Sequence, residues 1–235
     1  MQAVVLAGGK GKRLLPLTKV FPKPLVPLGE KPILDIILSQ LKYFGFTRVT
    51  LAVGHMAEMI QMYIGTGTRY GIEIDYSFED LPLGTVGPLA HVKSLDETFL
   101  VMNGDLVTNF DFRSFVNYHR EHRSIATIAT YKKPFKVELG IVHSVRDNSI
   151  VDYTEKPTYH YNVSMGIYAF DSAVLSYIEP NKYLDLPELI KRLLAQKESV
   201  RSYPFEGYWL DLGNYSDYEK AVEEFDSVKG GLHLE

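Results

Sequence analysis

Three glycines and a cluster of cations follow the first apolar run of the chain. The run ends at Leu6 and Ala7. The glycines come directly after it, at Gly8, Gly9 and Gly11. Glycines let the backbone approach a phosphate closely and present its N–H groups to it, and arginine and lysine add charge. The segment therefore predicts a triphosphate site, with a tight turn that binds no ligand as the alternative. The cations are Lys10, Lys12, Arg13 and Lys23.

The order of the glycines argues against two common nucleotide-binding loops. The dinucleotide fingerprint Gly-x-Gly-x-x-Gly does not fit, because charged residues follow Gly11. A Walker loop needs serine or threonine after its lysine, but Arg13 follows Lys12. The sequence therefore disfavours a dinucleotide-dependent oxidoreductase and a Walker-type nucleotide site.

Two aspartates that are far apart in the sequence each follow an apolar segment. Asp105 comes after a buried-type run and the pair Asn103-Gly104, and Asp211 comes after an aromatic segment. Mg²⁺ prefers one or two carboxylates together with phosphate oxygens and water. Two aspartates that meet over a triphosphate satisfy this preference, so the sequence favours a Mg²⁺ site. Turn and helix-cap roles are the alternatives for both aspartates.

The elements that must position these residues follow from the hydrophobic pattern. In the first half it predicts alternating strands and helices, which indicates right-handed βαβ units on a largely parallel sheet. The carboxyl ends of such strands are where α/β sheets bind ligands. The predicted strands cover residues 2–7, 48–53, 72–76 and 99–102, and the predicted helices cover 31–44, 55–64 and 84–95.

The second half is richer in β structure. We expect a single α/β domain over residues 1–235 with a three-layer, Rossmann-like mixed sheet. Residues 1–110 would form a nucleotide-binding half, and residues 111–225 would form a β-rich half that closes the site. The predicted helices here cover residues 112–122, 186–194 and 215–225, and the strands cover 125–131, 139–145, 150–154 and 163–170.

Composition limits the possible partners. The 235 residues carry a formal net charge of -4, so the overall balance does not suggest nucleic-acid binding. The absence of cysteine excludes disulfides, thiolate metal sites and a cysteine nucleophile. No apolar run approaches the roughly 20 residues of a membrane span. We therefore expect a cytoplasmic protein that contacts neither nucleic acid nor membrane.

The glycine-rich segment, with the Pro-x-Thr and Lys-Pro-Leu motifs after it, resembles the signature of the sugar-phosphate nucleotidyltransferases. The resemblance extends from Met1 to about Phe225 and implies a GT-A-like nucleotidyltransferase fold. It implies that Asp105 and Asp211 hold the metal. Lys12 departs from the pattern, because the family usually has threonine or serine there. The nucleotide-binding residues that it implies are Leu6, Ala7, Gly8, Gly9, Gly11, Glu79, Gly84, Thr85 and Asn103.

The resemblance also implies that residues 111–225 are a sugar-phosphate-binding half with its own subsite. Its members are Gly140, Glu155, Lys156 and Ser164, and Lys156 would meet the phosphate of the acceptor. On local sequence alone, Glu155 and Lys156 are a solvated charge pair. Mannose-type enzymes often have Asn-Ala-Gly where Ser164-Met165-Gly166 stands here.

The segment 79–88 resembles the family's loop against the nucleoside base. Gly84 permits close approach, and Thr85 offers a hydrogen bond. Glu79 offers a carboxylate that pairs with the N1–H and N2–H₂ groups of guanine, which uracil and thymine lack. An exposed turn is the alternative for Glu79.

The implied reaction is an in-line displacement in which a sugar 1-phosphate attacks the α-phosphorus of a nucleoside triphosphate and pyrophosphate leaves. Arg13, Lys23 and Lys156 would be the catalytic cations. We favour GTP with mannose or manno-heptose 1-phosphate, and glucose-1-phosphate uridylyl- or thymidylyltransfer is the alternative. A paralogue that binds nucleotide without turnover is a further alternative. A homodimer is the default expectation for oligomeric state.

Overall fold

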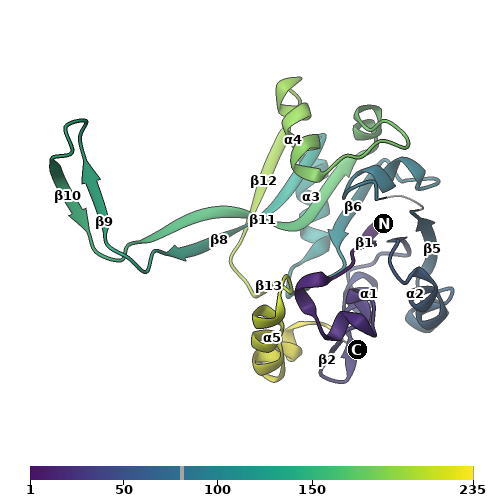
Figure 1. Cartoon of the computed structure of the whole chain (residues 1–235). Coiled ribbons are helices and arrows are strands. Elements are labelled where there is room, and N and C mark those ends of the chain that lie inside the picture. Colours follow the sequence, from purple (N-terminus) through teal and green to yellow (C-terminus); the bar gives the residue numbers. More distant parts are fainter. Residues whose placement is uncertain (80–81, 235) are drawn as a thin grey trace.

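A seven-stranded sheet forms the centre of the protein, in a computed structural model that describes residues 1–79 and 82–234 (Figure 1). Its strand order is β12-β8-β11-β6-β1-β4-β5. One half is parallel and contains β1 (Gln2–Ala7), β4 (Arg48–Val53), β5 (Glu73–Phe78) and β6 (Thr98–Asn103). In the other half, β11 (Thr158–Asp171) runs antiparallel to β6 and to β8 (Ala126–Lys136), and β12 (Val200–Phe205) runs parallel to β8.

Helices cover both faces of this sheet, which gives three layers. Successive side chains of a strand point to opposite faces, so Val4 and Val5 of β1 belong to two different buried clusters. The cluster of Val5 includes side chains of α1 (Ile33–Tyr43), α3 (Phe112–Glu121) and α5 (Tyr215–Val228). The cluster of Val4 includes side chains of α4 (Leu186–Ala195) and η5 (Gly87–His91). The predicted mixed α/β fold is confirmed.

The remaining elements are short. Small two-stranded sheets pair β2 (Pro27–Leu28) with β3 (Lys31–Pro32), β7 (Leu106–Thr108) with β13 (Trp209–Asp211), and β9 (Ile141–Ser144) with β10 (Ile150–Thr154). The other helical segments are α2 (Ala57–Ile64), η1 (Lys12–Leu14), η2 (Leu17–Lys19), η3 (Lys23–Leu25), η4 (Thr68–Tyr70), η6 (Ser172–Tyr177) and η7 (Lys229–Gly231).

One local prediction is wrong, and one strand of the central sheet was missed. The helix predicted over residues 84–95 is only the 3₁₀ segment η5, because the chain before it hydrogen-bonds elsewhere: the Val86 amide donates to the Leu184 carbonyl at 2.9 Å. The strand β12 was not predicted. It lies at the edge of the sheet and contains Pro204, which weakens a strand pattern but is tolerated at an edge.

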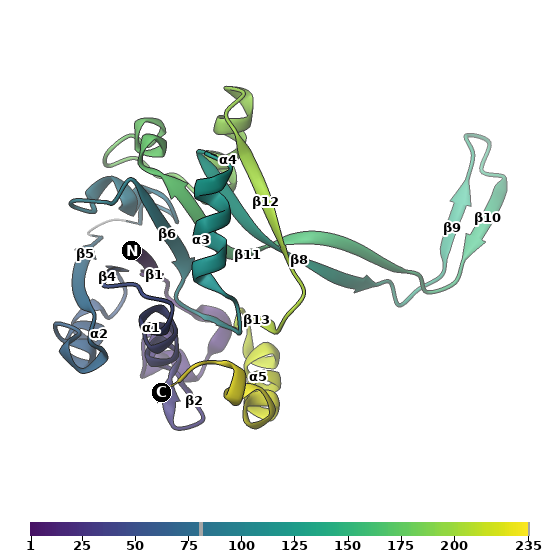
Figure 2. The same cartoon turned by 180° about the vertical axis from the view of Figure 1, so that it is seen from behind.

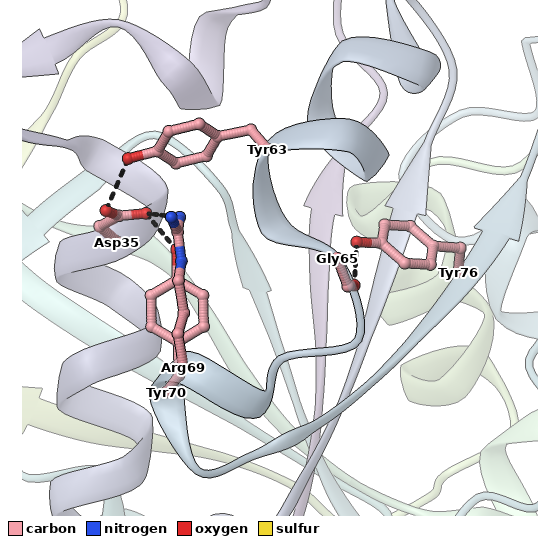
Figure 3. Close-up of polar contacts among 6 residues, drawn as sticks. All are labelled: Asp35, Tyr63, Gly65, Arg69, Tyr70 and Tyr76. Atoms are coloured by element: carbon pink, nitrogen blue, oxygen red, sulfur yellow. Dashed lines mark hydrogen bonds and ion pairs between the residues drawn. The ribbon is translucent and has the colours of Figure 1, made fainter.

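A polar cluster on the outer surface fixes α2 and η4 to α1 (Figure 3). The carboxylate of Asp35 in α1 accepts hydrogen bonds from Tyr63 at 2.9 Å and from Arg69 at 3.3 Å, and also from Tyr70. The Arg69 guanidinium lies 4.2 Å from the centre of the Tyr63 ring. Desolvation and the Asp35 carboxylate raise the pKa of Tyr70, so this hydroxyl stays protonated and donates. The cluster holds α2 in place beside the sheet.

The outer parts of β8 and β11 leave the sheet together as a long two-stranded arm. We define the arm as residues 132–162. Its ladder pairs Lys132 with Asn162 and Lys136 with Thr158, and the β9–β10 hairpin forms its tip. Figures 1 and 2 show from opposite sides that the arm projects away from the body. The arm therefore does not close over the first half, although residues after it in the second half reach the candidate site, as Leu212 does by its bond to Asp105.

A β-bulge marks the root of the arm. The register of β11 against β8 shifts between Ser164 and Tyr168, and Gly166 there has a φ of 74°. Bulges bend a strand and increase its twist. The bend separates the part of β11 that lies in the sheet from the part that forms the arm.

Candidate active site

The glycine-rich turn and the Asn103-Gly104-Asp105 segment lie side by side at the carboxyl ends of β1 and β6. Leu6 pairs with Asn103 in the parallel ladder. The amide of Gly104 donates to the carbonyl oxygen of Leu6 at 2.9 Å. A Cβ at position 104 would lie only 2.8 Å from that oxygen, so glycine is required for this approach. The two segments that the sequence singled out thus meet at the sheet edge where α/β folds bind ligands.

The turn after β1 is folded onto Thr18. Gly11 has a φ of 59°, and a Cβ there would lie 2.7 Å from the Thr18 side chain. The Thr18 hydroxyl and the Leu14 amide both donate to the Gly11 carbonyl at 2.8 Å. η1 then begins, with Leu14 buried and Arg13 exposed. No described atom lies within 4 Å of the position of a Cβ at Gly9, so there is open space beside the turn.

Lys23 and Asp105 form the partly buried centre of the site. Lys23 begins η3 between two prolines, and its ammonium group is ion-paired with Oδ2 of Asp105. Only 12% of the Lys23 side chain and 20% of the Asp105 side chain are exposed. The other carboxylate oxygen of Asp105, Oδ1, is buried and has no hydrogen-bond partner among residues 1–79 and 82–234. A buried oxygen of this kind is costly unless a ligand satisfies it.

Asp211 reaches the same site because β13 pairs with β7, which follows Asp105 directly. The Leu212 amide donates to the Asp105 carbonyl at 3.0 Å. A Cβ at Gly213 would lie 3.5 Å from Asp211 Oδ1 and 3.7 Å from Arg13 Nη1. The pKa of Asp211 is raised by burial and by Asp105, and the cations Lys23 and Arg13 oppose that rise. The structure therefore gathers two carboxylates and two cations around one point.

Glu79 lies over the glycine turn from the end of β5. A Cβ at Gly8 would be 3.3 Å from Glu79 Oε1, and the Leu83 amide donates to Glu79 Oε2 at 3.3 Å. Burial raises the pKa of this carboxyl, while the Leu83 hydrogen bond and His91 lower it. The carboxylate is therefore next to the turn, and its role in binding a base stays a prediction. Residues 80 and 81 of the same predicted segment lie outside the described residues.

Gly84 and Thr85 contact the chain before α4. A Cβ at Gly84 would lie 2.6 Å from the Leu184 carbonyl, and the Thr85 amide donates to Asp185 Oδ1 at 3.0 Å. The Thr85 hydroxyl accepts from the Leu186 amide at 2.8 Å. Fold contacts thus account for both residue types, and their roles in nucleotide binding stay predictions.

The sugar-subsite residues of the arm gather with one another. The Tyr153 hydroxyl donates to Glu155 Oε2 at 3.0 Å, and Lys156 Nζ lies 3.7 Å from Glu155 Oε1. A Cβ at Gly140 would overlap the Tyr153 hydroxyl, so glycine lets the Tyr153 ring lie where it does. Lys156 has a φ of 42°, in the left-handed region that non-glycine residues rarely adopt. The motif is therefore ordered as a unit.

This arm cluster is separate from the site on the body. Of the five charged residues expected to converge, four do so. The exception is Lys156, which belongs to the arm, and Figure 2 shows that the arm projects away from the body. The physical reason is that the β8–β11 ladder continues beyond the bulge instead of folding back. Ser164 lies at the root of the arm, where its hydroxyl shares a hydrogen bond of 2.7 Å with Tyr168. The sugar-binding roles of all four predicted residues stay predictions.

A family model described as nucleotidyl transferase matches residues 2–227. The chain belongs to the nucleotidyl transferase family. Among its relatives, a UTP–glucose-1-phosphate uridylyltransferase of Synechocystis is 33% identical and aligns with 94% of this chain and 62% of its own length. A mannose-1-phosphate guanylyltransferase catalytic subunit beta of Drosophila pseudoobscura is 35% identical, over 92% of this chain and 60% of its own length. The predicted resemblance to sugar-phosphate nucleotidyltransferases is confirmed.

Solved structures share the fold. A Bacillus anthracis protein assigned as a glucose-1-phosphate thymidylyltransferase, crystallised with sucrose, matches with a TM-score of 0.74 and 25% identity over 95% of this chain and 94% of its own. HddC from Yersinia pseudotuberculosis in complex with GMP-PN matches with a TM-score of 0.72 and 24% identity, over 95% of this chain and 99% of its own. The chain spans about three-fifths of the length of the curated relatives that it matches.

The oxygen donors of the candidate site would suit Mg²⁺ once a phosphate is bound, and the metal stays a prediction. Asp105 Oδ1 is a buried oxygen without a partner in the described part of the chain, and Asp211 lies beside it. Within the same part, no group of three or more histidine, cysteine, aspartate or glutamate residues is placed to hold a metal. Two aspartates with phosphate oxygens and water fit the preference of Mg²⁺, so phosphate would complete the coordination.

Asp217 is a member of the site that the sequence interpretation missed. A Cβ at Gly213 would lie 3.5 Å from Asp217 Oδ2, and Asp217 contributes to the raised pKa of Asp211. Asn214 caps α5 by accepting from the Asp217 amide at 3.0 Å, and it donates to Asp217 Oδ2 at 2.7 Å. Asn214 and Asp217 are three residues apart at the start of a helix, a spacing that resembles a capping box. This spacing is the sequence signal from which the position of Asp217 could have been predicted.

Two further features of the described residues bear on partners. Across residues 1–79 and 82–234, no helix combines the length and the apolar character needed to cross a bilayer. A polar cavity of about 680 Å³, lined by His119, Arg123 and Asp171 among others, lies at the opposite end of the strands. It contains none of the predicted site residues.

Proposed function

We propose that the protein is a magnesium-dependent sugar-1-phosphate nucleotidyltransferase. An oxygen of the sugar 1-phosphate attacks the α-phosphorus of a nucleoside triphosphate. The new phosphorus–oxygen bond forms as the bond to the β-phosphate breaks, and pyrophosphate leaves with that electron pair. The products are a nucleoside diphosphate-sugar and pyrophosphate.

The observation that carries this proposal is the convergence of Arg13, Lys23, Asp105 and Asp211 beside a glycine turn with open space. Two anions repel each other, and holding them in line is the main task of such an enzyme. Arg13 would hold the outer phosphates, and Lys23 would hold the α-phosphate in place of the Asp105 carboxylate it now contacts. Fixed cations aimed at developing charge lower the barrier.

The chain's own residues need not supply a general base. A phosphate monoester is already anionic near neutral pH, so its oxygen attacks without losing a proton to the protein. Asp105 and Asp211 would hold the metal, and Mg²⁺ when bound neutralises charge on the triphosphate. Lys156 would neutralise and orient the attacking phosphate.

We further propose GTP as the triphosphate, with mannose or manno-heptose 1-phosphate as the acceptor. The support is the Glu79 carboxylate, which lies next to Gly8 and matches the donor pair of guanine. A uridylyl- or thymidylyltransferase acting on glucose 1-phosphate is the second candidate. It is supported by the Synechocystis relative, whose name specifies UTP and glucose 1-phosphate.

The test is a matrix of GTP, UTP, dTTP, ATP and CTP against mannose, manno-heptose and glucose 1-phosphates, with pyrophosphate release as the readout. We expect one nucleoside triphosphate and one sugar 1-phosphate to give most of the activity, and we expect the activity to need Mg²⁺. Triphosphate binding without pyrophosphate release in every cell would show a non-catalytic paralogue and overturn the proposal.

The base assignment has its own test. We expect Glu79→Gln to reduce the preference for GTP over UTP by about tenfold or more, since a bidentate contact to a base is worth about 1–3 kcal/mol. Glu73→Gln on the same strand is a matched control, because Glu73 is exposed at the other end of β5. If Glu79→Gln keeps the wild-type preference for GTP over UTP, the assignment of Glu79 to guanine fails and the uridylyltransferase alternative is favoured.

A further inference from the structure

We propose that the arm of one copy completes the active site of a second copy, in a reciprocal two-fold exchange. This inference rests on the proposed function, because the residue that the body lacks is Lys156. In each copy, the arm carries the sugar-phosphate motif away from the carboxylates and cations of its own body (Figure 1). A two-fold axis would let each body receive the arm of its partner, as in domain swapping.

The arm is built like one half of an interface. Within the described chain, β9 and β10 form a sheet of two strands only, and an isolated hairpin of this kind is at best marginally stable in water. Its apolar side chains are uncovered, with Leu139 75%, Ile150 68% and Val151 62% exposed. Several large apolar side chains left exposed in one short hairpin are a feature of surfaces that bind another protein.

The size of the arm fits a specific association between two chains. A standard interface uses about 20–30 residues on each side, and the arm comprises about 30 residues. Reciprocal exchange would bury two such arms at once. A loose contact of the β9–β10 tip alone would leave most of this surface in water.

The sugar-phosphate motif on the arm is already formed, although it has nothing to act on there. Tyr153, Glu155 and Lys156 are linked by hydrogen bond and ion pair, and Gly140 accommodates the Tyr153 ring. Lys156 holds a left-handed φ of 42°, a conformation that persists where its surroundings fix it and that is concentrated at functional sites. A motif of this kind on a projecting arm is suited to delivery into another site.

The body offers an apolar acceptor surface beside residues 8–25, which carry Arg13 and Lys23 and which we call the catalytic loop. Val20 is 62% exposed between Arg13 and Lys23. Phe21, the next residue of the same loop, lines a recess of about 520 Å³ together with other mainly apolar side chains, among them Met59 and Met62. The catalytic loop and an uncovered apolar recess thus lie side by side. A partner's arm needs both, because it brings Lys156 together with exposed apolar side chains.

The root of the arm connects the exchange to the site. Gly166 lies at the bulge, and a Cβ there would be 2.6 Å from Asn103 Nδ2. The Trp209 indole N–H donates to the Met165 carbonyl at 3.0 Å, and Trp209 lies two residues before Asp211. The segments that carry Asp105 and Asp211 therefore both lie close to the root of the arm. Docking of the arm can thus change the positions of these two aspartates.

A complementation experiment tests the exchange. Asp105→Asn has a defective body and an intact arm, and Lys156→Ala has the reverse. Each homodimer should lose about 10²–10³ in rate, the effect of removing one charge from such a site. The hetero-dimer, purified through two tags after co-expression, should recover about half the wild-type rate, because one of its two sites is intact.

Any of three results would overturn the proposal. If the arm serves its own body, the hetero-dimer stays as inactive as either parent. If no hetero-dimer can be isolated and sedimentation shows a monomer, no exchange occurs. If Lys156→Ala alone keeps full activity, the role of Lys156 in the proposed function fails.

A second readout does not depend on activity. The chain has no cysteine, so Lys12→Cys on the exposed catalytic loop and Thr158→Cys on the exposed arm introduce the only two thiols. A short bis-maleimide should convert the doubly substituted protein to covalent dimer on a denaturing gel, whereas neither single variant should cross-link. An internally linked monomer, or no link at all, would count against the exchange even if the proposed chemistry is right.

Discussion

The backbone amide of Leu212 donates to the carbonyl oxygen of Asp105 at 3.0 Å. This bond extends the β7–β13 ladder and places Asp211 beside Asp105, although the two aspartates are far apart in the sequence. Because main-chain groups make the connection, neither carboxylate is needed to hold the two segments together. Substitutions of the Asp105 and Asp211 side chains therefore test the chemistry of the carboxylates and leave these main-chain bonds in place.

We expect Asp105→Asn to reduce pyrophosphate release by about 10²–10³, since one charged group in the reacting site is lost. Circular dichroism should show an unchanged fold, because the Leu212 bond to the backbone of Asp105 remains. Asp226→Asn, at a side chain 88% exposed on α5, is the control and should keep the wild-type rate. Full magnesium-dependent activity in Asp105→Asn would remove this aspartate from the proposed metal site.

Asp211→Asn should separate stability from activity. Burial and Asp105 raise the pKa of Asp211, so its charged form costs folding free energy at every pH above that raised pKa. Without Mg²⁺ the variant should therefore be more stable than the wild type at pH 7.5. A gain of about 1 kcal/mol corresponds to about 2–4 °C in Tm.

Added Mg²⁺ with triphosphate should stabilise the wild type and have a smaller effect on Asp211→Asn, which also loses activity. The measurement is a pair of thermal melts with and without these ligands. A variant that is less stable than the wild type under both conditions would show that the carboxylate has a structural role instead.

Arg13 and Lys12 are neighbours with different expected importance. Arg13 Nη1 lies 3.7 Å from the Cβ position of Gly213, beside Asp211, whereas Lys12 departs from the family pattern. We expect Arg13→Ala to lower kcat/KM by about 10²-fold and Arg13→Lys to recover only part of it, because lysine lacks the guanidinium fork. Lys12→Thr removes one exposed charge and should change kcat/KM by less than about tenfold. Equal losses in both would mean that total charge, not geometry, binds the triphosphate.

The sequence predicted the parallel half of the fold well because its signals are local. Buried strands give continuous apolar runs, and α1 shows Ile33, Ile37 and Leu41 at helical spacing, with a stop at Gly45, whose φ is 86°. Arg13, Lys23 and Asp105 could be placed near one another because they follow the ends of neighbouring strands.

The position of the arm could not be predicted in this way. The strand patterns over residues 139–145 and 150–154 are the same whether the hairpin folds back onto the body or projects from it. The pattern fixes which residues pair and does not fix the bend at Gly166, which depends on the contact with Asn103. The pairing of β13 with β7 likewise depends on main-chain bonds between segments with no shared sequence signal.

His119 should make stability depend on pH. Its side chain is 2% exposed and its Nδ1 lies 2.8 Å from the Thr127 hydroxyl. Burial lowers the pKa of His119 from 6.5 to about 4, an effect that Arg120 reinforces and Asp171 opposes. Between those values the unfolded chain binds a proton that the folded chain does not, so stability falls as the pH falls through this window.

The wild type should therefore lose up to about 3 kcal/mol of unfolding free energy between pH 6.5 and pH 4, beyond what its carboxylates contribute, at about 1.36 kcal/mol per pKa unit. His119→Gln keeps a hydrogen-bonding side chain toward Thr127 and has no titratable group, so urea melts of this variant should show a shallower decline over the same range. His160→Gln, at an exposed position on the arm, is the control and should follow the wild-type curve. Parallel curves for the wild type and His119→Gln would show that His119 is protonated in the folded protein at the same pH as in the unfolded chain.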